Sequence, residues 1–179
     1  FGYRNMTESP NFGKPHESQR GYFAAALYEA MVANKDIWLV CFDLGYGIFD
    51  KHFKDFPDRC INTGAAEQAG AGVCVGLALE GKVPFCYTIT SFYLRAAETI
   101  ALYLDGEKIS VKLVGSGRGR DYAHDGPSHD ANKAENFLDD GPHGFMTIKN
   151  YWPEEKEEIP DMVEEMVKNG KPSFVSLKR

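Results

Sequence analysis

The sequence has no long apolar run, and this absence argues against a membrane-spanning segment. Its apolar stretches, such as residues 37–42, are far shorter than the about 20 residues that a transmembrane helix needs. The first residues also lack the apolar core of a signal peptide. We therefore expect a cytoplasmic protein that makes no contact with a membrane.

The sequence has fewer basic residues than acidic ones. The chain has 20 Lys and Arg residues against 26 Asp and Glu residues, which gives a formal net charge of −6. Proteins that bind nucleic acid usually carry an excess of basic residues that neutralise phosphates. The charge balance therefore predicts no nucleic-acid partner.

Several well-known motifs are missing as well. The sequence has no P-loop, no GxGxxG that opens a helix after a strand, no GxSxG and no HExxH. The four cysteines have no CxxC spacing, and three of them lie among apolar or small residues, so we expect reduced and mostly buried thiols. They are Cys41, Cys60, Cys74 and Cys86.

The 179 residues, of which 43% are hydrophobic, fit one globular domain. We expect a polar N-terminal arm over residues 1–16 and a single domain over residues 17–179. Helical periodicity or capping signals predict helices over 18–34, 67–80 and 91–104, with Ser91 as an N-cap, and from about Pro160. Apolar runs predict strands over 37–42, 83–88, 109–114, 144–149 and 174–177.

This alternation predicts an α/β fold with a doubly wound, mostly parallel sheet and helices on both faces. In the first helix, apolar residues recur as a single buried stripe. Ligands of such sheets bind beyond the carboxyl ends of the strands. The candidate site segments are therefore 43–47, 62–68, 88–95 and 115–130.

Glu67 stands at the predicted start of a helix, among small and apolar neighbours. The ordinary role of an acidic residue there is to complement the positive end of the helix dipole. Burial would favour the protonated carboxyl, whereas the helix start favours the anion, so an acid–base role is the alternative.

Phe92 and Arg95 are three residues apart and so share one face of the helix start. A flat heteroaromatic ligand could stack on Phe92, although core packing is the more common fate of a phenylalanine. Arg95 could equally pair with Glu98 on the next turn.

Residues 121–130 contain two histidines and three aspartates around a Gly-Pro turn. Such a loop suits hydrogen bonding and proton transfer to a polyhydroxy substrate. Metal ligation is an alternative for this loop, but no spacing fixes a coordination geometry, and no metal ligand is assigned to this chain. We interpret His16, His52 and His143 as ordinary surface or core residues.

Five segments, taken in order, resemble the pyrimidine-binding domain of the transketolase family of thiamine diphosphate enzymes, which includes 1-deoxyxylulose-5-phosphate synthase. They are 43–44 (DL), 64–68 (GAAEQ), 91–95 (SFYLR), 125–129 (DGPSH) and 172–179 (PSFVSLKR). The resemblance covers about residues 17–179.

The resemblance implies that Glu67 is the catalytic glutamate that hydrogen-bonds the aminopyrimidine ring and favours its imino tautomer. It implies that the ring of Phe92 stacks on the pyrimidine. Ile89, Arg95 and Asp43 fall at further cofactor-binding positions. Arg95 matches the synthase pattern, because transketolases tend to have a tyrosine there.

His129 and Asp125 match residues that line the substrate channel, with His129 also in a catalytic role. Arg20 and Arg179 match arginines that hold a sugar phosphate, a task that suits the guanidinium group. Gly47 and Gly117 stand where transketolases usually have a serine and a histidine at the phosphate, so the acceptor site departs from the family pattern.

The family's diphosphate-binding domain, with its GDG motif and downstream asparagine, is not in this sequence. We therefore expect one subunit of a split enzyme, whose separate partner binds the diphosphate and supplies the magnesium ligands. The assembly expected is a heterotetramer or a homodimer of pyrimidine subunits.

The predicted reaction is transfer of a two-carbon ketol unit between sugar phosphate-like substrates. One alternative is a subunit of a thiamine diphosphate-dependent 2-oxoacid decarboxylase or dehydrogenase. Another is a non-catalytic domain that retains the fold.

Overall fold

The computed structural model describes residues 12, 15–139 and 144–179. Six strands form one sheet in the order β2-β1-β3-β4-β6-β5, and every neighbouring pair is parallel. The strands are β1 (Ile37–Cys41), β2 (Cys60–Asn62), β3 (Val83–Ile89), β4 (Lys112–Ser116), β5 (Lys149–Tyr151) and β6 (Ser173–Leu177). The predicted parallel α/β fold is confirmed.

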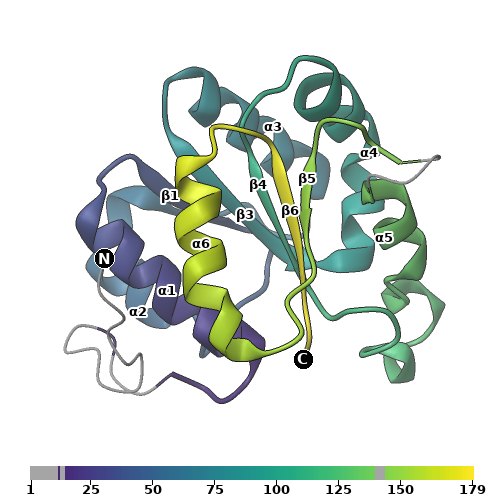
Figure 1. Cartoon of the computed structure of the whole chain (residues 1–179), viewed down its shortest axis with the longest axis horizontal. Helices are drawn as coiled ribbons and strands as arrows, with labels where there is room; N and C mark the ends of the chain where they lie inside the picture. Colours follow the sequence, from purple (N-terminus) through teal and green to yellow (C-terminus); the bar gives the residue numbers. More distant parts are fainter. Residues whose placement is uncertain (1–11, 13–14, 140–143) are drawn as a thin grey trace.

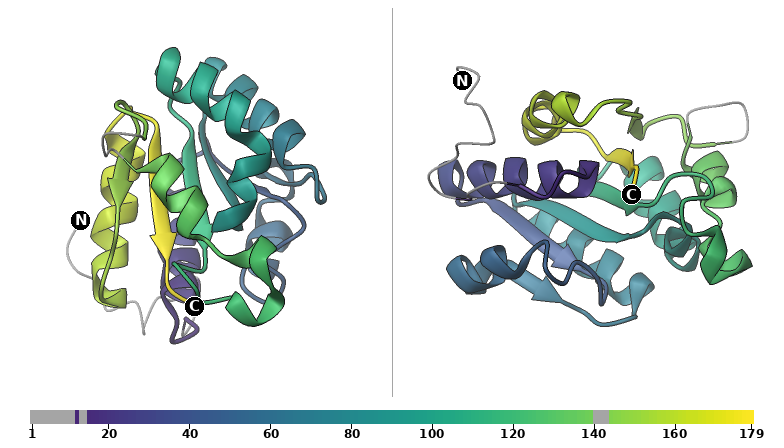
Figure 2. Two further views of the ribbon diagram at one scale, coloured as in Figure 1. Left: turned by 90° about the vertical axis from the view of Figure 1, so that its right-hand side faces the viewer. Right: turned by 90° about the horizontal axis from the view of Figure 1, so that it is seen from below.

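Helices cover both faces of this sheet (Figures 1 and 2). The α-helices are α1 (Gln19–Ala33), α2 (Asp50–Asp55), α3 (Glu67–Leu79), α4 (Ala97–Thr99), α5 (Asn132–Leu138) and α6 (Ile159–Lys168). Short 3₁₀ helices are η2 (Pro57–Arg59), η3 (Thr90–Ala96), η5 (Ala123–Asp125), η6 (Pro127–His129) and η7 (Lys156–Glu158), and η4 (Ile100–Gly106) is a π-helix.

The core divides into two clusters, one on each side of the sheet. Alternate residues of a strand feed opposite clusters: Leu39 packs with α1 and α6, whereas its neighbour Val40 packs with α3. The same alternation separates Phe85 from Cys86 in β3. This two-sided burial explains why the central strands are continuous apolar runs.

Helix α1 is buried more completely than predicted. Every residue from Gly21 to Tyr28 is buried, not a single stripe, because α1 is packed between the sheet, α6 and the segment before it. Its Ser18 is the N-cap, and the Ser18 hydroxyl accepts a hydrogen bond from the amide of Gly21 at 3.2 Å.

The predicted helix over 91–104 is wrong in type. The segment is 3₁₀ in η3, α-helical only in α4, and π-helical in η4. Ser91 is not an N-cap; its hydroxyl donates to the carbonyl oxygen of Ser128 at 2.8 Å. The buried Tyr93 anchors η3 to the sheet, because its hydroxyl donates to the carbonyl of Cys86 at 2.5 Å and accepts from the amide of Val114 at 2.9 Å.

The predicted strand over 144–149 is also displaced. Pairing with β6 begins only at Lys149. Thr147 is held elsewhere, because its amide donates to Asp105 Oδ1 at 2.9 Å and its hydroxyl donates to the Asp105 carbonyl at 2.8 Å. Strand β2 and helices α2 and α5 were not predicted, and each is too short to show a clear hydrophobic period.

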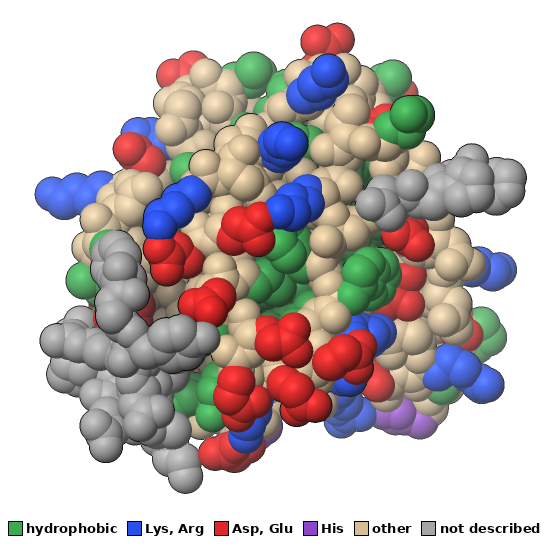
Figure 3. Space-filling view, viewed as in Figure 1, with side chains coloured by type: hydrophobic (Ala, Val, Ile, Leu, Met, Phe, Trp, Pro, Cys, Tyr) green, Lys and Arg blue, Asp and Glu red, His purple; other side chains and the backbone are tan. Residues whose placement is uncertain are grey.

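Three further expectations concern the cysteines, the acidic run and membrane-spanning helices. The four cysteines are free and buried, as predicted. The acidic run 154–158 is largely exposed, and acidic side chains gather on the face that carries α6 (Figure 3). Within the described residues, no helix has the length and apolar character needed to cross a bilayer.

Candidate functional site

The candidate residues lie at the carboxyl ends of the parallel strands, as the fold requires. Asp43 follows β1, Glu67 follows β2, and Phe92 follows β3. The 121–130 loop follows β4, and Arg179 follows β6. The structure sorts most of these residues into two groups.

The first group, which we call the glutamate cluster, contains Glu67, Arg95, Phe92 and His129. Glu67 is the first residue of α3 and is only 4% exposed. Arg95 Nη1 donates to Glu67 Oε1 at 2.7 Å, so Arg95 pairs with Glu67 and not with Glu98. Glu67 Oε2 accepts no hydrogen bond from the described residues.

The 3₁₀ geometry of η3 explains how Phe92 and Arg95 meet. With three residues per turn, side chains at i and i+3 stand directly above one another. The Arg95 guanidinium carbon lies 4.1 Å from the centre of the Phe92 ring. This contact covers one face of the half-buried ring and aims the guanidinium at Glu67.

His129 completes the glutamate cluster. Its ring meets the ring of Phe92 edge to face, with 5.1 Å between centroids. Its Nδ1 is 3.0 Å from the Ser128 hydroxyl, which leaves Nε2 without a hydrogen-bond partner among the described residues. The Ser91 bond to the Ser128 carbonyl fixes this turn against η3.

The second group, the arginine cluster, contains Arg20, Tyr122, His124, Asp125 and Arg179. Arg20 Nη1 donates to the Tyr122 hydroxyl at 2.8 Å, and Arg179 Nη1 is 3.2 Å from His124 Nε2. His124 Nε2 also lies 3.4 Å from Asp125 Oδ2. The cluster is built from α1, the loop after β4 and the end of the chain.

Two predicted residues lie outside both clusters. Ile89 is 8% exposed and is the last residue of β3. Asp43 has a positive φ of 53° and accepts a hydrogen bond from the Tyr46 hydroxyl at 2.9 Å. This bond to a carboxylate raises the pKa of Tyr46.

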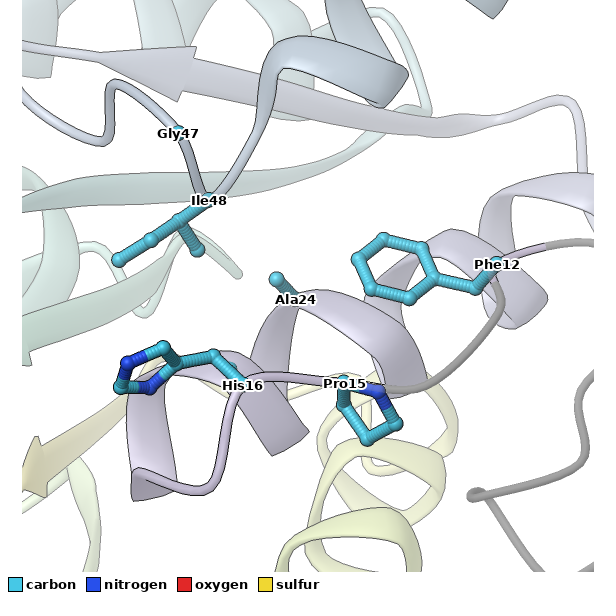
Figure 4. A pocket seen from close by; sticks show the side chains of 7 residues that line it. Phe12, Pro15, His16, Ala24, Gly47 and Ile48 are labelled. Carbon is cyan, nitrogen blue, oxygen red and sulfur yellow. The ribbon is translucent and has the colours of Figure 1, made fainter.

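A hollow of about 360 Å³ lies beside the arginine cluster, between α1 and the loop after β1. Figure 4 shows Phe12 and Ile48 pointing into it, with His16 at its edge. Gly47 of the candidate segment 43–47 lines it, whereas none of the residues predicted to bind cofactor or substrate does. The residues of the glutamate cluster are not among those that line this hollow.

The structure describes two of the three histidines that we interpret as ordinary surface or core residues. His52 is fully buried and His16 is exposed, as expected of core and surface residues, whereas His143 lies outside the described residues. Across the described part of the chain, no three His, Cys, Asp or Glu side chains are grouped so that they could hold a metal ion.

Sequence comparison decides the family. Residues 18–179 match the family model described as transketolase, pyrimidine binding domain. The chain belongs to this family.

Relatives of this pyrimidine-binding domain include a probable chloroplastic 1-deoxy-D-xylulose-5-phosphate synthase of Capsicum annuum. It is 36% identical over 114 residues, which are 63% of this chain and 16% of that protein. One of the subunits of an apulose-4-phosphate transketolase from Actinobacillus succinogenes is 30% identical over 127 residues, 69% of this chain and 39% of that protein. The chain therefore spans well under half the length of these relatives.

A solved structure described as a split gene transketolase, inactive beta4 tetramer, shares the fold. Its TM-score is 0.77 at 27% identity, over 90% of this chain and 52% of that chain. The similarity agrees with the all-parallel sheet described above.

Sequence reasoning missed Tyr122, and it left His124 without a role. The only sequence signal for either was membership of the 121–130 loop. Their contacts with Arg20 and Arg179 join segments that are 102 and 55 residues apart in the chain.

Proposed function

We propose that this chain is the pyrimidine-binding subunit of a split, thiamine diphosphate-dependent transketolase that transfers a two-carbon ketol unit between sugar phosphates. The observation that carries the proposal is the buried carboxylate of Glu67, paired with Arg95, whose guanidinium lies over the Phe92 ring. Two relatives described as a transketolase subunit and a split-gene transketolase support the split arrangement.

The glutamate cluster fits the aminopyrimidine ring of thiamine diphosphate. When bound, this cofactor supplies the carbon nucleophile that carries the ketol unit. Glu67 would hold the ring through a hydrogen bond to a ring nitrogen, and its Oε2 is unused by the described residues. Phe92 would stack against the ring on the face that Arg95 leaves uncovered.

The burial of Glu67 strengthens the hydrogen bonds that its carboxylate can make. A carboxylate that is 4% exposed would bind a ligand in a poorly solvated setting, where a hydrogen bond is stronger than in water. Arg95 balances the charge of the ionised form from one side. With the cofactor bound, Glu67 would hold the proton that it shares with a ring nitrogen of the aminopyrimidine.

His129 is placed to act on the substrate. The Ser128 hydroxyl occupies Nδ1, so Nε2 is free to exchange a proton with a hydroxyl of the sugar. The edge-to-face contact with Phe92 would hold the imidazole close to a ring stacked on Phe92. We assign Asp125 to the same substrate channel.

The diphosphate and a magnesium ion would be bound by a separate partner chain. Helix α3 offers a surface for such a chain, because a Cβ added at Gly72 or Gly76 would meet nothing within 4 Å. Val73 and Leu79 on the same helix are 39% and 69% exposed. Small residues beside exposed apolar ones allow a second backbone to approach closely.

The test is to mix the purified chain with a diphosphate-binding transketolase chain from the same organism. We expect thiamine diphosphate-dependent ketol transfer from the mixture and none from this chain alone. Glu67→Ala should lower the rate by about 100-fold or more, which is the typical worth of a general acid–base group.

The matched control is Glu80→Ala, which removes an exposed glutamate at the other end of α3. It should leave the rate within twofold of the unmodified pair. Near-normal activity in Glu67→Ala, activity from this chain alone, or turnover of 2-oxoacids but not of ketoses would contradict the proposal.

A further inference from the structure

Tyr122 links two elements at the carboxyl edge of the sheet. Its hydroxyl accepts a hydrogen bond from Arg20 Nη1 at 2.8 Å and lies 3.0 Å from the hydroxyl of Ser116. Ser116 is fully buried at the end of β4. Because Arg20 is the donor in its bond, the phenolic proton is free to point at Ser116. The Arg20 side chain is thereby tied to a rigid strand end.

The ring of Tyr122 also positions Arg179. The guanidinium carbon of Arg179 lies 5.1 Å from the ring centroid. The backbone amide of Arg179 donates to Asp121 Oδ2 at 2.9 Å, and the same carboxylate oxygen accepts from the amide of Arg118 at 3.0 Å. Arg179, which follows β6, is therefore held beside Tyr122 by backbone and ring contacts together.

Tyr122 fills the space beside Gly117. Gly117 has a φ of 82°, and a Cβ built there would lie 2.3 Å from both Cδ2 and Cε2 of the Tyr122 ring. A side chain at position 117 and the present placement of this ring exclude one another. The present position of the Tyr122 ring therefore requires a glycine at position 117.

The two guanidinium groups held by Tyr122 have no ion-pair partner within the part of the chain that the structure describes. Among the described residues, neither Arg20 nor Arg179 lies within ion-pair distance of an acidic side chain, whereas Arg95 and Arg118 are each paired with a glutamate. Arg20 Nε is buried and has no hydrogen-bond partner in residues 12, 15–139 and 144–179. Two such groups beside one ring suit an oxyanion that can accept several N–H bonds.

We propose that Tyr122 is a positioning residue that sets the specificity of the substrate's phosphate site: its hydroxyl fixes Arg20, its ring fixes Arg179, and its bulk replaces a side chain at position 117. The proposal rests on the proposed function, because it assumes that a sugar phosphate enters this edge. The resemblance already implies that Arg20 and Arg179 hold a sugar phosphate; the proposal adds that Tyr122 sets the positions of both guanidinium groups, with His124 adjoining Arg179.

The first test measures phosphate binding to the whole chain without a partner or cofactor. Inorganic phosphate is titrated while arginine side-chain and backbone NMR signals are followed. We expect Tyr122→Phe, which keeps the ring and removes the bond to Arg20, to weaken phosphate binding about fivefold to tenfold, the usual worth of such a bond.

The matched control is Tyr151→Phe, which removes a hydroxyl that accepts from Asn169 Nδ2 in the edge strand β5. It should bind phosphate like the unmodified chain. In an Arg20→Met background, Tyr122→Phe should weaken phosphate binding by less than a further twofold, because the Tyr122 hydroxyl acts on phosphate through Arg20. Circular dichroism and the melting temperature of each variant verify folding.

The second test uses the chain mixed with its partner. Tyr122→Phe should raise KM for a phosphorylated acceptor sugar about fivefold to tenfold and leave kcat within twofold. KM for the same sugar without its phosphate should stay unchanged.

An unmodified chain with no phosphate-induced shift near Arg20 and Arg179 would overturn the proposal, as would equal phosphate binding by Tyr122→Phe. Either result leaves the proposed function standing if the mixture still shows cofactor-dependent ketol transfer. Loss of that activity in the unmodified mixture would instead refute the proposed function.

Discussion

His52 gives the fold a specific dependence on pH. The imidazole is fully buried in α2, and its Nε2 lies 3.0 Å from the carbonyl oxygen of Ala24. Nε2 therefore carries the proton of the neutral ring, and Nδ1 is buried without a hydrogen-bond partner among the described residues. The rings of Tyr28 and Phe49 surround it at 5.4 and 5.1 Å between centroids. Protonation would put a charged N–H into a site without an acceptor.

Burial lowers the pKa of His52 from 6.5 to about 4, although the bond to Ala24 opposes the shift. The nearest charged groups, Lys51 and Asp55 of the same helix, have smaller and opposite effects. Between pH 4 and 6.5 the unfolded chain binds more protons than the folded chain, so stability falls as pH falls. The free energy of unfolding should drop by about 2 kcal/mol between about pH 8 and about pH 5 from this group alone.

Urea denaturation across this pH range measures the effect. In His52→Gln, whose amide can still donate to the Ala24 carbonyl, about 2 kcal/mol of the pH dependence should vanish. His16→Gln, which removes an exposed histidine, should keep the full dependence. Parallel pH curves for the unmodified chain and His52→Gln would refute the reasoning.

Two further predictions concern packing. A Cβ at Gly70 would lie 2.2 Å from Cε1 of Phe42, so Gly70→Ala should lower the free energy of unfolding by about 1–3 kcal/mol. A Cβ at Gly72 in the same helix would meet nothing within 4 Å, so Gly72→Ala should raise the free energy of unfolding by up to about 1 kcal/mol. Equal melting temperatures for these two variants would contradict the geometry. Arg59 donates to the carbonyls of Met31, Asn34 and Ile37, so Arg59→Lys, which keeps the charge but loses the planar fork, should cost about 1–2 kcal/mol in urea denaturation. An unchanged urea midpoint would show that the charge alone suffices.

The central part of the fold could be predicted from sequence because its signals are local. Strands β1 and β3 are apolar runs, and their predicted bounds match the structure to within one residue. Glu67 was placed at a helix start from the small residues around it, and it is the first residue of α3. These features depend on a few neighbouring residues.

The features that the sequence did not predict depend on contacts between residues that are far apart in the chain. The shift of β5 follows from Asp105 holding Thr147, and the 3₁₀ start of the 91–104 segment accompanies the anchoring of Tyr93 to two strands. Ser91 has the composition of an N-cap, yet it bonds to Ser128. Tyr122 carried no periodic or capping signal, because its role depends on Arg20, which lies 102 residues earlier.

The most direct test of the central claim is a calorimetric titration of thiamine diphosphate and magnesium into this chain mixed with its diphosphate-binding partner. We predict saturable binding to the mixture and binding at least about tenfold weaker when Glu67 is changed to Gln, because the ring loses its charged hydrogen-bond partner. Equal affinity for the unmodified and Glu67→Gln mixtures, or no binding to the unmodified mixture, would contradict the assignment of the glutamate cluster to the cofactor.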